Sequence, residues 1–455
     1  MNTYFFVAPK KTNFCMQITI FSTNPSPRLD YSIKVFFEHL SSHPYTLTYD
    51  KNTYLRSAGA KINYSKVSLD PNELWVIPET LLFQTSLQHS PVQVNWVEGC
   101  PWLSFEEKNA GHLPADPFAS SFYLLSRYEE YLPFVADQHG RFSAAQSLAK
   151  REGFLQIAVV QHWLNALLKV LQQKYPDFMP TPPPYHFAPT YDVDMPWAFC
   201  YRPWWKQWGG SLRDLLLGKK QRWQDRRRAL QNPEDDPFYN FTQLHKWHEK
   251  NGLSPRFFLL MGDAAQYDTN PSPDLPAQQA LIRDLAAHYP LGIHPSYLSN
   301  SEPERLTMEK QRLEKIADQT ITHSRQHFLK LHLPETYRRL IAAGIQADFS
   351  MGYADDTGFR AGTAVPFPWY DLEREVCTNL MIHPFVAMDV TLQQYLGLSA
   401  EEAYSRLKDL HQEVKQVGGP LCLLWHNSSF YAEDGWEGWE EMYERLLQLA
   451  KTSTI

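Results

Sequence analysis

The sequence predicts an α/β protein in which a parallel (β/α) barrel of about seven strands follows a smaller α/β domain. The first observation is size: 455 residues with 43% hydrophobic side chains can bury a large core and form two or three domains. The second is a proline-dense segment near residue 180. The third is the pattern after that segment, where short apolar runs alternate with amphipathic helices.

The proline-dense segment, YPDFMPTPPPYHFAP at residues 175–189, is expected to be stiff and extended. We therefore predict an N-terminal domain over residues 1–175, a linker over 176–189 and the barrel over 190–455. The N-terminal domain shows no obvious catalytic set. Its predicted elements are helices at 31–40, 116–134 and 153–171 and a strand at 72–78.

After the linker, seven apolar runs of strand length alternate with helices. This alternation is typical of a parallel sheet, and seven such strands indicate a closed or nearly closed barrel. The predicted strands are 186–194, 255–261, 291–297, 324–331, 345–353, 379–390 and 420–427, and the predicted helices are 241–252, 276–289, 302–319, 334–344 and 399–418.

Charge and cysteine content exclude several classes of protein. The chain has 43 basic and 50 acidic residues and a formal net charge of −7, so nucleic acid is not an expected partner. Its five cysteines are far apart and form no C-x-x-C pair, which argues against a disulfide framework and a zinc ribbon. The apolar stretch before Pro9 is too short for a signal peptide, and no later run is long enough for a membrane span. We therefore expect a cytoplasmic protein.

Polar residues lie on or at the ends of several predicted strands, where (β/α) barrels carry their catalytic side chains. Each residue alone has a structural explanation, because a strand-end Asp often caps the next helix and a lone His is often a hydrogen-bonded core residue. Capping does not require histidine, however, so the combination predicts a shared site. The residues are Asp192, Asp194, His294, Arg325, His327, Asp348, Ser350 and His426.

The order of these motifs resembles the polysaccharide deacetylase, or NodB-homology, superfamily of metal-dependent carbohydrate esterases. The resemblance extends from about Tyr185 to the end of the chain and is greatest for a bacterial branch that has an N-terminal extra domain. It implies a NodB-like barrel and a hydrolase acting on non-peptide C–N bonds. The matching segments are PTYDVD (189–194), GIHPSY (292–297), SRQHFL (324–329), ADFSMGY (347–353) and CLLWHN (422–427), together with DPFASSFYLLSRYEEYLP (116–133) and GFRAGT (358–363) for the branch.

The first motif departs from the family pattern. The paired aspartates of the family are adjacent, whereas Val193 separates Asp192 from Asp194. Residues two apart in an extended strand face the same side, so both carboxylates can still reach one pocket.

The second motif also departs from the pattern. The family has His-x-x-x-His, but Leu298 stands four residues after His294. From the chemistry, we infer that His327 on the next strand supplies the missing imidazole, with His323 as a competitor.

The resemblance implies a catalytic base with a positioning arginine, a general acid with a carboxylate partner, and a divalent metal for which zinc is the expected ion. In that order the catalytic residues are Asp192, Arg325, His426 and Asp348, and the metal ligands are Asp194, His294 and the inferred His327.

The implied substrate is an N-acetylated amino sugar of a surface polysaccharide or of its precursor. Arg360 could clamp a carboxylate of such a substrate or form a structural ion pair with an Asp of the barrel. Tyr297 and Trp425 could stack on sugar faces, although coincidence also explains single aromatic residues in a chain with 14% aromatic content. Two other functions stay open: a degenerate glycan-binding member, which Leu298 favours, and a hydrolase of C–N bonds in small molecules.

The segment 201–230 differs from the rest of the chain. It contains nine Lys or Arg and two Asp, a net charge of +7, together with four tryptophans. A basic and aromatic insertion of this kind could contact a membrane surface, an anionic glycan or a lipid-linked sugar. The alternative is a solvated helix whose tryptophans pack on the barrel.

Overall fold

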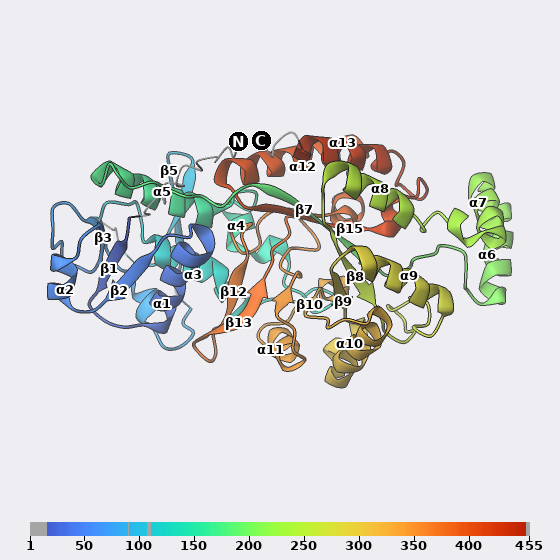
Figure 1. Cartoon of the computed structure of the whole chain (residues 1–455), viewed down its shortest axis with the longest axis horizontal. Coiled ribbons are helices and arrows are strands. Elements are labelled where there is room, and N and C mark those ends of the chain that lie inside the picture. The colour runs from blue at the N-terminus through green and yellow to red at the C-terminus, as the bar shows by residue number, and fades with distance from the viewer. Residues whose placement is uncertain (1–15, 90, 107–110, 452–455) are drawn as a thin grey trace, which may run out of the picture.

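The computed structural model describes residues 16–89, 91–106 and 111–451. These residues form a nine-stranded and a four-stranded sheet, both mainly parallel and covered by helices, and a two-stranded antiparallel sheet (Figure 1). Residues 1–15, including Cys15, lie outside the described residues. The expectation that the chain has no leader concerns this segment. The other four cysteines are not in disulfides. No helix in the described ranges has the length and apolar content that crossing a bilayer requires.

The larger sheet has nine strands in the described part of the chain, in the order β12-β13-β11-β10-β9-β8-β7-β15-β14. All neighbours are parallel except β12 and β13. The sheet curls, and no pairing within the described residues joins its edges β12 and β14, so it is an open half-barrel (Figure 1). Its strands are β7 (His186–Val193), β8 (Arg256–Leu260), β9 (Leu291–His294), β10 (His323–Ser324), β11 (Ala347–Asp348), β12 (Phe367–Asp371), β13 (Val376–Ile382), β14 (Ala387–Met388) and β15 (Pro420–His426).

The strand count therefore differs from the predicted seven. Each of the seven apolar runs overlaps a strand, but the run 379–390 contains parts of both β13 and β14. Strand β12, at one edge of the sheet, was not predicted, because its five-residue sequence FPWYD is too short to show a period. The antiparallel β12 lies at that edge.

The register of the central strands brings the sequence motifs to one edge of the sheet. Strand β15 is almost entirely buried, as expected for a central parallel strand. It pairs with β7 so that His426 lies opposite Asp192. Strand β8 pairs with β9 so that Leu260 lies opposite His294. Because parallel strands end at the same edge, these polar residues converge there.

Helices cover the outside of the half-barrel, with α12, α13 and α8 along one side and α9, α10 and α11 along the other (Figure 1). Helix α12 begins with a capping box, in which Ser399 and Glu402 satisfy each other's backbone N–H groups. It ends at Gly418 with a φ of +83°, where a side chain would also collide with the Pro183 carbonyl. The helices are α8 (Phe241–Asn251), α9 (Pro276–His288), α10 (Pro303–Ala317), α11 (Glu335–Ala342), α12 (Ala400–Val417) and α13 (Trp439–Lys451).

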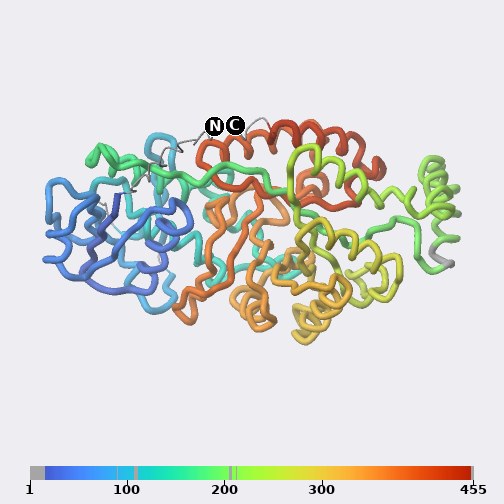
Figure 2. Tube along the Cα trace, viewed as in Figure 1, coloured from blue at the N-terminus to red at the C-terminus, as the bar shows by residue number. Residues whose placement is uncertain are grey.

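The smaller sheet is built from the N-terminal part, in the order β2-β1-β3-β4. A separate antiparallel hairpin of β5 and β6 follows it. Helix α5 ends this part of the chain, which then continues into β7 (Figure 2). The elements are β1 (Ile18–Ser22), α1 (Pro27–Lys34), β2 (Tyr45–Thr48), α2 (Lys51–Arg56), β3 (Ala60–Tyr64), β4 (Leu74–Val76), β5 (Gln93–Val97), β6 (Cys100–Ser104), α3 (Pro117–Leu125), α4 (Leu148–Arg151) and α5 (Val159–Lys174).

The two parts of the chain pack closely against each other. One hydrophobic core extends through both of them. The Tyr31 hydroxyl donates a hydrogen bond to the Pro368 carbonyl of β12, and Arg28 forms an ion pair with Glu375. Strand β7 begins at His186, inside the segment expected to be a linker. The division of the chain into two domains stays a prediction.

The basic segment forms two helices, α6 (Trp204–Leu216) and α7 (Lys220–Gln231), between β7 and α8. They lie together at one end of the molecule, beyond the helices that cover the half-barrel (Figures 1 and 2).

Candidate metal centre and active site

A cavity of about 710 Å³ opens at the carboxyl edge of the larger sheet. Five of the predicted site residues line it: Asp192, Asp194, His294, His327 and His426. They come from the ends of β7, β9 and β15 and from the turn after β10, so these predicted residues meet at one edge of the sheet.

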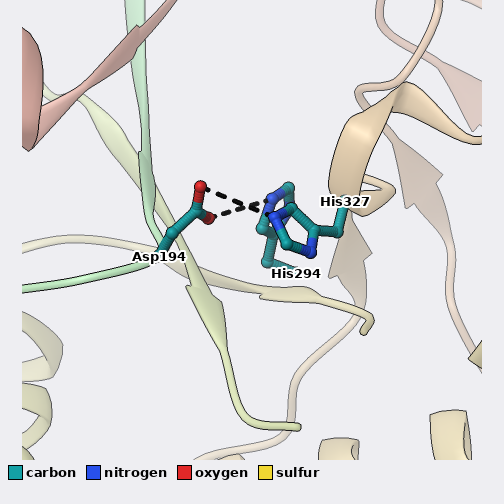
Figure 3. Close-up of side chains that lie close together, drawn as sticks. All are labelled: Asp194, His294 and His327. Atoms are coloured by element: carbon teal, nitrogen blue, oxygen red, sulfur yellow. Dashed lines mark ion pairs between the residues drawn. The ribbon is translucent and has the colours of Figure 1, made fainter. Parts of the chain in front are cut away.

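Asp194, His294 and His327 face one another in this cavity (Figure 3). The Nε2 atom of His294 lies 3.3 Å from Oδ1 of Asp194, and the Nε2 atom of His327 lies 3.6 Å from Oδ2. One ligand atom from each of the three residues lies within 4.8 Å of the others. Two imidazoles and a carboxylate at this spacing form a donor set that suits a divalent transition metal.

Hydrogen bonds orient both imidazoles toward Asp194. Nδ1 of His294 lies 2.6 Å from the Arg325 carbonyl, which can only accept, so this nitrogen carries the proton. Nδ1 of His327 lies 2.8 Å from Oδ1 of Asp268, which also holds the backbone N–H of Tyr297. In the neutral form of each ring, the lone pair of Nε2 is therefore free to bind a metal ion. Metal-binding histidines commonly have such a hydrogen-bond partner at the other ring nitrogen.

The oxygen Oδ1 of Asp194 is buried and has no hydrogen-bond partner in the structure. An unsatisfied buried carboxylate oxygen is costly unless a cation lies against it. Together with the two oriented imidazoles, this orphan oxygen means that the residues present fit a bound divalent metal.

The charges of the cluster depend on one another. Burial alone would raise the pKa of Asp194, but His327 and His294 outweigh it and hold the pKa well below its ordinary value. Burial would likewise lower the pKa of His327, whereas Asp194 and Asp268 raise it to about 9. The cluster without a metal therefore attracts protons, and a metal has to compete with them.

Asp192 lies beside this cluster and is held by Arg325. Nη1 of Arg325 donates to Oδ1 of Asp192 at 2.9 Å, while Nη2 donates to Thr190 and Nε to the Phe349 carbonyl. The arginine side chain is completely buried and therefore rigid. The other oxygen of Asp192 lies 3.7 Å from Nε2 of His294. The predicted base and the predicted positioning arginine are thus in direct contact.

His426, at the end of β15, also lies close to the Asp194–His294–His327 cluster. Its Nε2 atom is 3.9 Å from Oδ2 of Asp194. The carboxylate bonded to it is Asp389: Oδ1 of Asp389 is 2.8 Å from Nδ1 of His426, and Oδ2 accepts the backbone N–H of His426. Burial would lower the pKa of His426, but Asp389, with smaller effects of Asp194 and Asp192, raises it to about 10.

Asp348 was expected to be that partner, and the structure corrects this pairing. Asp348 is buried on β11, where it accepts hydrogen bonds from the hydroxyls of Ser324 and Ser350 and from the Ser350 backbone. Burial raises the pKa of Asp348 above its ordinary value. Its carboxylate joins neighbouring strands beneath the site, and Asp389 takes the position beside His426.

Two of the three expected substrate-contacting residues lie elsewhere in the core. Arg360 is buried, and its guanidinium donates to both carboxylate oxygens of Glu130 and to the Gly352 carbonyl. It therefore forms a structural ion pair, but its partner is Glu130 of the N-terminal part and not the expected Asp of the barrel. Trp425 is 1% exposed and packs on Tyr443 from the outer helix layer, because side chains alternate along β15.

Tyr297, the third residue, lies near the cavity without lining it. Its ring packs between Tyr267 and Phe328, and its hydroxyl lies 3.2 Å from Nδ1 of His139. Lys330 lies over the ring at 4.0 Å. These contacts explain its half-buried position.

Sequence reasoning missed two carboxylates, Asp268 and Asp389. Asp389 follows β14 directly, so the same strand-end rule could have found it once the run 379–390 was divided into two strands. Asp268 lies in the segment between β8 and α9, where no regular pattern marks it. The competitor His323 starts β10 and packs on Phe349 outside the three-residue cluster.

Comparisons with known proteins cover different parts of the chain. The profile of a family of unknown function (DUF7033) matches residues 18–176. No curated protein matches the chain.

Several solved structures are similar to a part of the chain at low identity. A protein described as a polysaccharide deacetylase from Mycobacterium smegmatis is 15% identical, with 59% of this chain and 84% of that chain covered and a TM-score of 0.38. Puue allantoinase is 13% identical, with 58% and 84% covered and a TM-score of 0.36. A protein described as a polysaccharide deacetylase from Pseudomonas aeruginosa PAO1 is 14% identical, with 58% and 85% covered and a TM-score of 0.35. At such values, function has to be inferred from the side chains of the site.

Proposed function

We propose that this protein is a metal-dependent hydrolase that removes an acyl group, namely N-acetyl, from an amino sugar of a surface polysaccharide or of its precursor. One observation carries the proposal: a metal-type donor set, an arginine-held carboxylate and a carboxylate-held histidine all line the same cavity. The sugar and the acyl group follow from the motif resemblance and are part of the proposal.

Asp194, His294 and His327 would hold the metal, for which zinc is the first candidate. A divalent cation bound there supplies Lewis-acid chemistry, polarising an acyl carbonyl and making water more acidic. Asp268 and the Arg325 carbonyl keep the two imidazoles in the orientation and tautomer that binding needs.

Asp192 is the proposed general base. Arg325 fixes one of its oxygens, and the other is directed toward the His294 side of the cavity. A carboxylate held in this way can take a proton from water that attacks the acyl carbon.

His426 is the proposed general acid. Asp389 holds Nδ1, so Nε2 is the ring nitrogen left to face the cavity. A proton on Nε2 can pass to the amine nitrogen as the C–N bond breaks, while the Asp389 carboxylate stabilises the charged ring before that transfer.

The experiment measures acetate release from N-acetylated oligosaccharides and from small amides by wild type and Asp192→Asn. The amide is nearly isosteric but cannot accept the proton, so we expect turnover to fall about 10²–10⁴-fold with bound metal unchanged. The exposed Asp274, changed to Asn, serves as the matched control and should keep full activity.

Equal turnover in wild type and Asp192→Asn would contradict the assigned base. Release from small amides alone would replace the sugar substrate by a small molecule. Saturable glycan binding with no release from any substrate would establish the non-catalytic binder instead.

A further inference from the structure

Helices α6 and α7 form a hairpin that projects from one end of the molecule (Figure 1). Its inner side is held by charges: Arg226 donates to the buried Asp214 and lies 4.4 Å from the Phe199 ring centre. Tyr431 donates a hydrogen bond to Asp225. Both acidic residues of the segment are therefore turned inward and paired.

The outer side of the hairpin exposes large apolar side chains. Trp208 is 75% exposed, and Leu215, Leu216 and Leu217 are 66%, 77% and 64% exposed. The three leucines are consecutive and lie at the end of α6, where the chain turns into α7. Burial of this exposed apolar cluster by another surface would be strongly favourable.

Exposed cations lie on the second helix of the hairpin, α7. On α7, Lys220, Trp223, Arg227 and Leu230 follow one another at spacings of three and four, so they share a face. All four are exposed, and Arg227 lies over the Trp223 ring at 5.9 Å. The whole segment carries +7 in a chain whose net charge is −7.

We propose that the α6–α7 hairpin docks on the surface of an anionic lipid bilayer, with Leu215, Leu216 and Leu217 inserted among the headgroups. Exposed leucines and tryptophan beside a row of Lys and Arg are the composition of helices that lie in a membrane interface. The charge is complementary to anionic lipids, and each cation near such a surface strengthens binding about fivefold.

The hairpin is also fixed to the mouth of the cavity. Arg222 and Lys219 both form ion pairs with Asp434, and Arg222 and Asp434 line the cavity. Docking of the hairpin therefore brings the cavity next to the membrane. If the protein has the proposed function, its substrate is a glycan held at the membrane surface.

Flotation of the full-length protein with vesicles tests the docking without any use of activity. We expect wild type to bind vesicles of phosphatidylcholine and phosphatidylglycerol, to bind pure phosphatidylcholine at least about tenfold less, and to be released by salt. Replacing the three leucines by Ser, or making Lys220→Glu with Arg227→Glu, should each weaken binding at least about tenfold.

The matched controls lie on the exposed surface of the N-terminal part. Val67→Ser removes an apolar side chain that is 66% exposed, and Lys51→Glu with Lys66→Glu makes the same charge change as the α7 pair. Both should bind vesicles like wild type.

Three results would overturn the proposal. The first is no binding of wild type to anionic vesicles. The second is loss of self-association, instead of vesicle binding, in the triple Ser variant, which would make the hairpin a contact between two copies. The third is unchanged vesicle binding of the α7 variant with lost binding to a soluble anionic polysaccharide.

Discussion

Among the buried charges of the described residues, the group around Glu130 and the group around Asp194 differ in whether every polar atom has a hydrogen-bond partner. In the first, Glu130 accepts hydrogen bonds from Arg127 and Arg360, and Arg127 also reaches Glu129 and Tyr353. In the second, at the cavity, Oδ1 of Asp194 has no hydrogen-bond partner, and one imidazole nitrogen faces each oxygen of this carboxylate.

The difference separates a structural ion cluster from a candidate binding site. Charges buried in an apolar core need complete pairing, because an unpaired one destabilises the fold by several kcal/mol. The cluster around Glu130 meets this requirement and joins α3 and its following turn to the segment of Arg360. The cavity cluster leaves donor atoms free, as a site for a further cation does. Both groups contain residues that the sequence suggested for function. They are distinguished by whether all of their polar atoms have hydrogen-bond partners.

The largest expected effect is the loss of protein stability when the Glu130 ion cluster is broken. Glu130→Ala leaves Arg127 and Arg360 buried without their shared carboxylate, so we expect a loss of about 3–5 kcal/mol in the free energy of unfolding. Urea unfolding followed by circular dichroism measures it. Glu304→Ala, at an exposed position on α10, is the control and should change stability by less than about 0.5 kcal/mol. Equal stability of both variants would remove the distinction between the two groups.

The second effect concerns support of the metal-type cluster. Asp268→Ala removes the acceptor that orients His327, so zinc should bind about 10–100-fold more weakly in calorimetric titration. Asp268→Asn keeps an acceptor oxygen and should restore part of the affinity. Asp284→Ala, on the exposed face of α9, should bind zinc like wild type. Unchanged affinity in Asp268→Ala would show that His327 is not a ligand or does not need this partner.

The smallest expected effect is the pH dependence of the stability that the Glu130 ion cluster provides. Burial would raise the pKa of Glu130, but Arg360 and Arg127 lower it from 4.5 to about 2. Because the folded-state pKa is depressed, this stabilisation is fully present above the unfolded-state pKa and is lost as pH falls through about 2. We expect a slope of at most about 1.4 kcal/mol per pH unit from this group between pH 4.5 and 2. Urea midpoints across that interval should show a shallower slope in Glu130→Gln than in wild type, and identical slopes would contradict the assignment.

The sequence predicted the segments of the fold well where a regular period exists. Helices α8, α9, α10 and α12 lie within a few residues of the predicted ranges, because each has an apolar face at helical spacing. The short edge strands β12 and β14 were not resolved as separate strands by that argument, because two to five residues give little periodicity.

The candidate site was predictable to the extent that it depends on strand ends. Asp192, Asp194, His294 and His426 follow from that rule, and the His327 position followed from the chemistry of a missing imidazole. The partner of His426 could not be predicted in this way, because Asp348 ends β11 and Asp389 follows β14, so only their contacts distinguish them. Arg360 and Glu130 are 230 residues apart, so nothing local in the sequence indicates their ion pair.

Metal content measures the central claim most directly. Purified protein loaded with zinc and then desalted should contain about one ion per chain by mass spectrometry, and His294→Ala and His327→Ala should each contain almost none, because loss of one ligand of three leaves a poor site. His323→Gln, a nearby histidine outside the cluster, should contain as much as wild type. Full zinc content in both alanine variants, or no zinc in wild type, would contradict the account.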